Sequence, residues 1–402
     1  MPLKYPELEN RRIIIGVTGS IASYKILELV RGIVRAKGQV KVVMTRNATK
    51  FITPYAFSTL TGNPVYVDLF PPDFSWSPLH ISLSEWGEVM LVAPATANIL
   101  GKAANGIADD LLSTLILSFP NPIIFAPAMN ENMWKNPAVE ENICILRERG
   151  FEVIPPEKGE LATGKVGEGR LPSPETLLFW LRKCFYPQNL KGLKILITAG
   201  PTREYIDDIR FISNPSSGKM GYFLAEEAVL RGAEVILISG ESTQPVPPGV
   251  EKIVIEKGEE LEKEVKKFFP SCDVLIMNAA VTDFRPCKKM EGKIKREGKL
   301  SLELIPVPDI LAGLGKEKKG KLIVGFSLET EEVEKRALEK FKKKKVDIMV
   351  GCLQKEGYSG FKVENMEGII IYSTRQKERF SLTKRELAEL IMERIAERRF
   401  EK

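Results

Sequence analysis

In the first half of the chain, short apolar runs alternate with longer stretches in which apolar residues recur with a helical period. The predicted strands are 13–17, 40–44, 89–93, 123–126 and 151–154, and the predicted helices are 22–37, 99–105, 110–118 and 137–149. Uniformly apolar strands separated by helices are typical of a parallel sheet covered on both faces. The stretch 155–174 is rich in glycine, proline and charge, and we predict a loop or flap there.

The alternation resumes after a Tyr-Pro-Gln-Asn stretch near residue 187. The predicted strands are 195–198, 234–238, 252–255, 274–277, 322–325, 346–350 and 368–372, and the predicted helices are 220–231, 259–269, 332–344 and 384–398. The pattern therefore predicts an α/β protein with two doubly wound, Rossmann-like parallel-sheet domains, residues 1–187 and 188–402.

Both predicted domains open with an apolar strand that meets a glycine turn. In the first, Gly16-Val-Thr-Gly19 leads directly into a helix; in the second, the turn Gly200-Pro-Thr precedes a helix delayed to 217–225. Free N–H groups and the positive dipole end of a helix suit phosphate. Two such openings favour two phosphate-bearing ligands, although the Gly-x-Gly-x-x-Gly dinucleotide spacing is absent from the first.

Composition narrows the class of ligand. The 402 residues are 44% hydrophobic and 28% charged, and the formal charge of +6 favours anionic small molecules over nucleic acid.

No apolar run has the length of a membrane span, and the N-terminus lacks the apolar core of a signal peptide. Five cysteines without a Cys-x-x-Cys pair indicate a reducing cytoplasm, and the single histidine, His80, excludes a multi-histidine metal site.

Small and polar residues follow the central strands of the first domain, where open α/β sheets bind ligands. Ala93-Pro-Ala-Thr-Ala-Asn98 would admit a flat ring, and Asn130 could hydrogen-bond a carboxylate. A lone histidine is more often structural than catalytic, and the Met and Trp residues near Asn130 are more often core residues.

Five segments in order carry a specific resemblance. They are Gly19-Ser-Ile-Ala, Pro78-Leu-His-Ile-Ser-Leu, Ala93-Pro-Ala-Thr-Ala-Asn, Gly106-Ile-Ala-Asp-Asp-Leu-Leu and Pro127-Ala-Met-Asn-Glu-Asn-Met-Trp. Together they resemble the flavin-dependent cysteine decarboxylases. The second half resembles phosphopantothenate–cysteine ligase, and the joined pair is similar, over nearly the whole chain, to the bifunctional coenzyme A biosynthesis family.

The resemblance implies an FMN site and a decarboxylation in the first domain. FMN would oxidise the cysteinyl group to a thioaldehyde, carbon dioxide would leave, and the enethiolate would then be reduced. His80 would act as the catalytic base-like residue, and Asn130 would hold the substrate carboxylate. The residues implied around FMN are Gly19, Ser20, Ile21, Thr45, Ala93, Thr96 and Asn98.

One position departs from the family. Where the family flap carries a cysteine that donates a proton to the enethiolate, this chain reads Leu-Ala-Thr163-Gly. An alcohol is a far weaker acid than a thiol, so Thr163 is a doubtful donor. Water or Lys165 could replace it, or the reaction could stop at the enethiol.

The second domain contains a hydroxyl-rich turn at a predicted helix start, Ser216-Ser217-Gly218, which suits a phosphate. A merely capped helix is the alternative. The resemblance assigns Arg210 and Asn214 to the phosphopantothenate intermediate and makes the acyl-nucleotide intermediate depend on Lys293. The implied nucleotide and substrate positions are Asn278, Ala279, Ala280, Asp283, Pro308, Asp309, Ile310 and Phe326.

Lys340 and Lys344 lie four residues apart on a predicted helix, hence on one face. Two adjacent ammonium groups would suit a triphosphate, whereas a lysine-rich helix end also complements its own dipole. With the resemblance, we expect the triphosphate. The family's Ala-Asn-Asp pattern after this helix is replaced by Gly351-Cys-Leu, which weakens the expected nucleotide contacts.

The implied ligation uses CTP. The substrate carboxylate would attack the α-phosphate, releasing pyrophosphate, and the amine of cysteine would displace CMP from the acyl-CMP. Mg²⁺ is expected on the CTP phosphates, with Asp283 as the one candidate protein ligand. The small-molecule substrates would be phosphopantothenate, cysteine and CTP, with no nucleic acid and no membrane.

The resemblance also implies a homo-oligomer, with trimeric decarboxylase contacts and dimeric ligase contacts that a dodecamer would satisfy together. Two alternatives to the bifunctional enzyme stay open. One is a ligase whose first domain binds flavin but decarboxylates poorly, which Thr163 motivates. The other is a non-catalytic, flavin-binding regulatory subunit.

Overall fold

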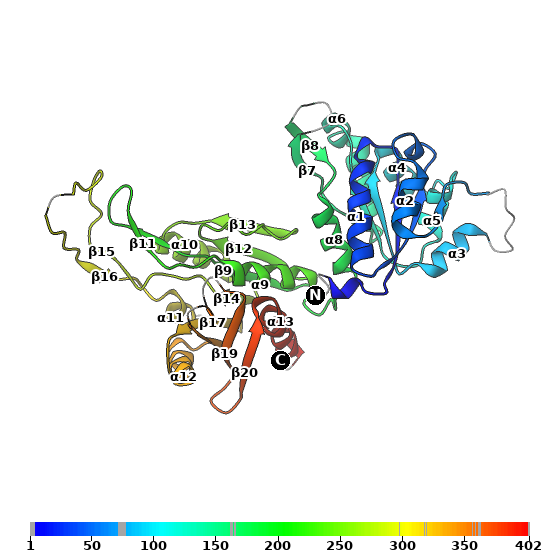
Figure 1. Ribbon diagram of the computed structural model, residues 1–402. Coiled ribbons are helices and arrows are strands. Elements are labelled where there is room, and N and C mark those ends of the chain that lie inside the picture. The colour runs from blue at the N-terminus through cyan, green and yellow to red at the C-terminus, as the bar shows by residue number, and fades with distance from the viewer. Residues whose placement is uncertain are drawn as a thin grey trace. The chain divides into compact units, whose positions relative to one another are not determined.

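The computed structural model describes residues 5–70, 78–160, 164, 166–296, 298–316, 318, 320–355, 357, 359–360 and 363–400. The chain forms two compact units, Met1–Tyr186 and Pro187–Lys402. Each unit is an α/β domain built on its own sheet (Figure 1). Within the described residues, no helix combines the length and the apolar content needed to cross a membrane.

The sheet of the first unit is parallel throughout, with the order β3-β2-β1-β4-β5-β6. Its strands are β1 (Arg12–Val17), β2 (Gln39–Met44), β3 (Val65–Tyr66), β4 (Val89–Ala95), β5 (Ile123–Pro127) and β6 (Glu152–Val153). The chain runs outward from β1 in one direction and then returns to β4 on its other side. Ligands of such sheets bind at this reversal point, outside the carboxyl ends of the strands.

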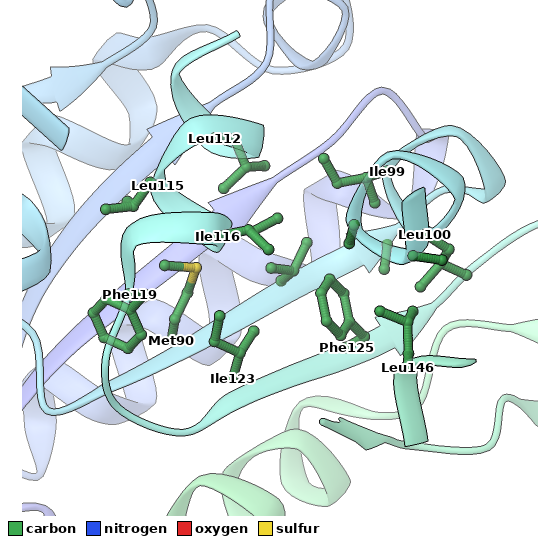
Figure 2. Close-up of a cluster of buried hydrophobic side chains, with 14 of the residues drawn as sticks. Met90, Ile99, Leu100, Leu112, Leu115, Ile116, Phe119, Ile123, Phe125 and Leu146 are labelled. Atoms are coloured by element: carbon green, nitrogen blue, oxygen red, sulfur yellow. The ribbon is translucent and has the colours of Figure 1, made fainter. Parts of the chain in front are cut away.

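Helices cover both faces of this sheet (Figure 1). They are α1 (Tyr24–Arg35), α2 (Pro54–Thr61), α3 (Leu79–Trp86), α4 (Ala97–Asn105), α5 (Leu111–Ser118), α6 (Glu131–Trp134), α7 (Pro137–Glu148) and α8 (Pro174–Lys183). The predicted helices are present, and α2, α3, α6 and α8 are additional. One core cluster packs Met90 and Phe125 of the sheet against Leu100, Leu115 and Leu146 of the helices (Figure 2).

The stretch that we predicted to be a loop or flap contains a hairpin. Strands β7 (Glu157–Glu160) and β8 (Val166–Arg170) pair antiparallel. In β8 the buried positions are glycines, Gly167 and Gly169, and the residues between them are exposed. Because the strand has no buried apolar side chains, its sequence does not show the pattern that predicts a strand.

The second unit repeats the strand order of the first and then extends it. Its sheet order is β13-β12-β9-β14-β17-β18-β19-β20, in which the first six strands are parallel and the last two pairings are antiparallel. The strands are β9 (Lys194–Ala199), β12 (Glu234–Ser239), β13 (Val250–Val254), β14 (Val274–Met277), β17 (Leu322–Glu329), β18 (Ile348–Leu353), β19 (Asn365–Ile371) and β20 (Lys377–Thr383).

The second sheet contains the predicted parallel strands and adds two antiparallel pairings at one edge. Strand β20 was missed because Phe380 is its only buried residue, so it presents no apolar run.

The helices of the second unit are α9 (Lys219–Leu230), α10 (Gly258–Phe268), α11 (Ile310–Leu314), α12 (Val333–Lys344) and α13 (Lys384–Phe400). Two small hairpins project from this layer: β10 (Arg203–Tyr205) with β11 (Phe211–Ser213), and β15 (Phe284–Pro286) with β16 (Leu304–Pro306).

Candidate functional site

The residues that we predicted around a flavin follow the carboxyl ends of four neighbouring parallel strands. Gly19, Ser20 and Ile21 follow β1, and Thr45 follows β2. Ala93 lies in β4, while Thr96 and Asn98 come directly after it. Asn130 follows β5. The fold thus places these residues along one edge of the first sheet, at its reversal point.

Thr18, which sequence analysis missed, ties the two central strands together at this edge. Its buried hydroxyl donates to the Pro94 carbonyl oxygen (2.6 Å) and accepts from the Thr96 N–H (3.2 Å). A buried hydroxyl that satisfies both of its roles fixes the separation of the two loops. Only the strand pairing of β1 with β4 could have revealed this contact.

Gly19 is required by close packing. A Cβ at this position would lie 2.7 Å from the Cβ of Asn47, in the loop after β2 that also carries Thr45. The following turn is held by Ser20, whose Oγ accepts from the Ala22 N–H at 3.3 Å. The two loops therefore meet at the edge only because residue 19 has no side chain.

Asn130 lies beneath the flap. Its Oδ1 accepts from the Asn132 N–H (2.9 Å), and the neighbouring Met129 N–H donates to the Gly169 carbonyl oxygen of β8 (3.0 Å). A Cβ on Gly169, which has φ +116°, would lie 2.3 Å from the Met129 carbonyl oxygen. The hairpin β7–β8 is thus anchored on the loop that carries Asn130. Thr163, at the family's cysteine position, lies outside the described residues.

His80 lies in the first turn of α3 and is half-buried. Within the described ranges, no hydrogen bond joins it to the predicted flavin residues. The structure therefore brings together the strand-end residues of the first unit but does not link His80 to them.

The strand-end residues suit a flavin nucleotide. Thr96 is the N-cap of α4, yet its side chain makes no capping hydrogen bond, so the first N–H groups of α4 keep no side-chain acceptor. Asn98 is exposed, and the buried Ala93 allows close approach of a ring. Uncapped N–H groups beside small residues offer donors to an anionic, flat ligand.

The second unit gathers its predicted residues around a pocket of about 430 Å³. The loops after β11 and β14, the start of α9, and parts of α12, β17 and β18 line it. The predicted residues in its wall are Asn214, Ser216, Ser217, Gly218, Asn278, Ala279, Ala280, Asp283, Pro308, Asp309, Ile310, Phe326, Lys340 and Lys344. Arg210 and Lys293 are not among the residues that line it.

Asn214 is held in one orientation by the backbone opposite it. Its Nδ2 donates to the carbonyl oxygens of Ala280 (3.3 Å) and Val281 (3.1 Å). Because both amide hydrogens are directed at these carbonyls, Oδ1 is left to accept from a ligand.

The two lysines expected to hold a triphosphate are already paired with carboxylates. Lys340 Nζ lies 2.6 Å from Glu329 Oε1, and Lys344 Nζ lies 3.4 Å from Asp309 Oδ2. Glu329 is buried. A polyphosphate would share these ammonium groups with the carboxylates instead of meeting free cations.

Three buried hydroxyl groups lie in or beside the wall of the same pocket. Thr198 Oγ1 accepts from the N–H groups of Asn278 (3.1 Å) and Ala279 (3.0 Å), which fixes the loop after β14. Thr282 and Ser327 also line the pocket, and their buried hydroxyls have no hydrogen-bond partner among the described residues. Unsatisfied buried polar atoms are uncommon and need a structural or functional reason.

Arg210 and Lys293 belong to a second cluster, organised by the buried Asp207. Asp207 Oδ1 accepts from the N–H groups of Ile209 (2.8 Å) and Arg210 (2.6 Å), and Oδ2 accepts from the Ile294 N–H (3.1 Å) and lies 3.0 Å from Arg210 Nη1. The Arg210 N–H is the largest cause that lowers the pKa of Asp207, to about 2. Asp207 thus fastens the segment carrying Lys293, which is itself exposed, to the loop carrying Arg210.

Side chains that could bind a metal ion are not grouped in the part of each unit that the structure describes. Among the described residues, no three His, Cys, Asp or Glu side chains are arranged to hold a metal ion. Asp283 lines the pocket and is exposed, so it could contact a cation that arrives with phosphates.

Each unit matches the model of a known protein family. A family model described as "Flavoprotein" matches residues 3–184, and one described as "DNA/pantothenate metabolism flavoprotein C-terminal domain" matches residues 190–399. The chain is 40% identical over 395 residues to the coenzyme A biosynthesis bifunctional protein CoaBC of Bacillus subtilis (strain 168), covering 97% of each chain. The chain belongs to the CoaBC family. The CoaBC of Mycobacterium bovis is 40% identical over 381 residues and covers 90% of each chain.

Solved structures match each half of this CoaBC family member separately. The C-terminal domain of a CoaBC protein is 35% identical, with a TM-score of 0.46, and covers 54% of this chain and 100% of that one. A mutant PPC decarboxylase complexed with pantothenoylaminoethenethiol is 31% identical, with a TM-score of 0.39, and covers 43% of this chain and 100% of that one.

Proposed function

We propose that this protein catalyses two successive reactions of coenzyme A biosynthesis. Its second unit joins 4'-phosphopantothenate to cysteine with CTP, and its first unit decarboxylates the resulting 4'-phosphopantothenoylcysteine to 4'-phosphopantetheine. The observation that carries the proposal is the match to the bifunctional CoaBC of Bacillus subtilis over 97% of the chain, together with a pocket that gathers the implied ligase residues.

For ligation, the substrate carboxylate attacks the α-phosphate of CTP and releases pyrophosphate, and the amine of cysteine then displaces CMP. Asn214 Oδ1, directed by the carbonyls that hold its amide, accepts from the substrate. Lys340 and Lys344 bind the triphosphate, and Lys293 stabilises the charge that develops at the acyl phosphate. Mg²⁺ bound with the phosphates would neutralise part of their charge, and Asp283 is the residue that would contact it.

For decarboxylation, the residues at the edge of the first sheet hold FMN. Bound flavin supplies a reversible two-electron oxidation at its ring. The loops of Gly19–Ile21, Thr45 and Thr96–Asn98 bind and orient it, Asn130 binds the substrate carboxylate, and His80 moves a proton.

We also propose a homo-oligomer, because Ile21, Tyr24 and Tyr55 expose 55%, 57% and 80% of their surface.

A full-length assay with CTP, cysteine and phosphopantothenate tests both reactions at once. We expect CTP-dependent pyrophosphate release followed by loss of carbon dioxide, with FMN bound to the protein. Pyrophosphate release without carbon dioxide would favour the ligase-only alternative that Thr163 motivates. No pyrophosphate release with any nucleoside triphosphate would contradict the proposal.

The Thr163 position has its own test. Anaerobic turnover of phosphopantothenoylcysteine, followed by mass spectrometry, distinguishes the reduced product from an accumulated enethiol. We expect Thr163→Cys to accelerate the final reduction, because a thiol is the better proton donor. Equal rates in the two proteins would show that another group or water donates the proton.

A further inference from the structure

Lys384, the first residue of α13, is a buried cation in the ligase pocket. It is 5% exposed and lines the pocket. Among the described residues, its ammonium makes no hydrogen bond and no ion pair within 4.0 Å, in contrast to Lys340 and Lys344. Nothing in the sequence singled it out, because it lies 40 residues beyond Lys344 on a strand-to-helix junction.

Charges of both signs surround Lys384. Burial is the largest cause that lowers its pKa; among the charged groups, Glu364 raises the pKa, Lys219 lowers it and Cys352 raises it. Glu364 is exposed and already forms an ion pair with Lys219. This carboxylate is therefore shared between two lysines.

The start of α9 contributes to the same end of the pocket. This 12-residue helix has Gly218 as its N-cap, and the hydroxyl oxygens of Ser216 and Ser217 accept from the N–H groups of Gly218 (3.3 Å) and Lys219 (3.5 Å). The residues before it, Ser216 and Ser217, line the pocket as Lys384 does. The positive dipole end of a helix, two hydroxyls and a buried ammonium form an environment in which an anion is favourable.

Burial of an ionised ammonium without a partner is costly unless an anion compensates it. We propose that Lys384 binds a phosphate group of a substrate at the end of the pocket formed by residues 216–218 and the start of α9. This assignment rests on the proposed ligase function. The phosphate comes either from the polyphosphate of the nucleotide or from the phosphate monoester of phosphopantothenate.

The test uses the full-length protein with Lys384→Met, Lys384→Arg and, as a matched control, Lys377→Met. Lys377 lies in β20, is outside the pocket lining and pairs with Glu334 at 2.8 Å. We expect Lys384→Met to raise the KM of one phosphate-bearing substrate by about 10- to 100-fold, the loss typical of a charge-assisted hydrogen bond. Lys384→Arg should restore most of the affinity, and Lys377→Met should leave both KM values unchanged.

The two sources of phosphate give different results. A higher KM for CTP alone assigns Lys384 to the nucleotide, and a higher KM for phosphopantothenate alone assigns it to the monoester. Unchanged KM values in a folded Lys384→Met protein would overturn the proposal. So would a lower melting temperature without any KM effect, because that result marks a structural lysine.

A binding measurement separates this proposal from the ligase function. Without ligand, Lys384→Met should melt at the same temperature or higher, since an unpaired buried charge is removed. Inorganic pyrophosphate should raise the melting temperature of the unaltered protein more than that of Lys384→Met. An equal rise in both would count against Lys384 as a phosphate ligand, whether or not the protein proves to be a ligase.

Discussion

The two units share a strand order and differ in what covers the carboxyl edge of the sheet. In both, a threonine near the end of the first strand accepts from N–H groups of the loop after the fourth, Thr18 in one unit and Thr198 in the other. The second unit then adds antiparallel strands and α13, whose Lys384 and the neighbouring Met366 of β19 reach the pocket wall. The first unit adds the hairpin β7–β8, anchored through Gly169.

The shared parallel layer therefore determines where candidate residues meet, and the added elements determine how they are enclosed. In the second unit, segments from across the domain surround a pocket of about 430 Å³. In the first, the enclosing element is a short hairpin that a backbone hydrogen bond from the Met129 N–H to the Gly169 carbonyl oxygen ties to the loop of Asn130. Variants that act on one unit and spare the other test this separation.

The largest effect is expected from His80→Asn. We expect decarboxylation to fall by about 10²- to 10⁴-fold, the range for loss of a proton-transferring group. Ligation should stay unchanged, because His80 lies in the other unit from the ligase pocket. The visible absorbance of bound flavin should also stay unchanged, since among the described residues no hydrogen bond joins His80 to the predicted flavin residues. Carbon dioxide release and pyrophosphate release, measured on the same sample, provide the check. Unimpaired carbon dioxide release would assign His80 a structural role.

Asp207→Asn should produce the converse result. Loss of the carboxylate frees the segment carrying Lys293 from the Arg210 loop, so ligation should fall by about 10- to 100-fold through misplacement. Asp208→Asn alters an exposed carboxylate that pairs with Lys289 and accepts from the Gly292 N–H (2.8 Å) on the same segment. It should have a smaller effect, because an exposed contact contributes less than the buried Asp207. Decarboxylation of supplied phosphopantothenoylcysteine should be unaltered by both. If Asp207→Asn ligates normally, the segment needs no such anchor.

Gly169→Ala tests the backbone contact between the hairpin β7–β8 and the loop that carries Asn130. The added Cβ would meet the Met129 carbonyl oxygen, so the hairpin should shift and decarboxylation should slow by about tenfold. Gly150→Ala is the matched control, because Gly150 also has positive φ (+87°) but nothing lies within 4 Å of its Cβ position. Similar rates for the two variants would mean that backbone strain, and not flap docking, is responsible.

Thr18→Val and Thr198→Val test the contact common to both units. Each removes a buried hydroxyl that serves backbone N–H groups, and each should lower the free energy of unfolding by about 1–3 kcal/mol. Denaturant unfolding monitored unit by unit gives the measurement. Thr49→Val is the control, since its hydroxyl bonds only at the surface, to the Arg46 carbonyl oxygen. An effect of either variant on the other unit would contradict the separation.

The smallest expected effect is on the stability of the second unit at low pH. The pKa of Asp207 is about 2 in the folded protein, below the usual range of about 4 for an unfolded chain. Its stabilising contribution is therefore complete above pH about 4 and is lost as the pH falls toward 2. Unfolding of the second unit followed from pH 5 to 2.5 should show this loss in the unaltered protein and less of it in Asp207→Asn. If the free energy of unfolding falls equally with pH in the two proteins, Asp207 does not contribute to the acid sensitivity.

The sequence by itself determined the architecture and much of the ligase pocket. Buried parallel strands are apolar throughout, so 13–17 and 274–277 were readable as strands from composition alone. Because the carboxyl ends of parallel strands share one edge, the residues after them, such as Asn130 and Asn278, had to lie along it. That inference needs only local pattern and the geometry of the sheet.

Tertiary structure alone decided the contacts between distant segments. Strand β20 has one buried residue, and the hairpin β7–β8 packs through glycines, so neither gives an apolar pattern. Asp207 and Lys384 look like ordinary surface charges in the sequence. Their burial, and with it their electrostatic importance, arises only when segments about 90 and 170 residues away fold over them, because the free energy of a charge depends on its surroundings in space and not on its neighbours in the chain.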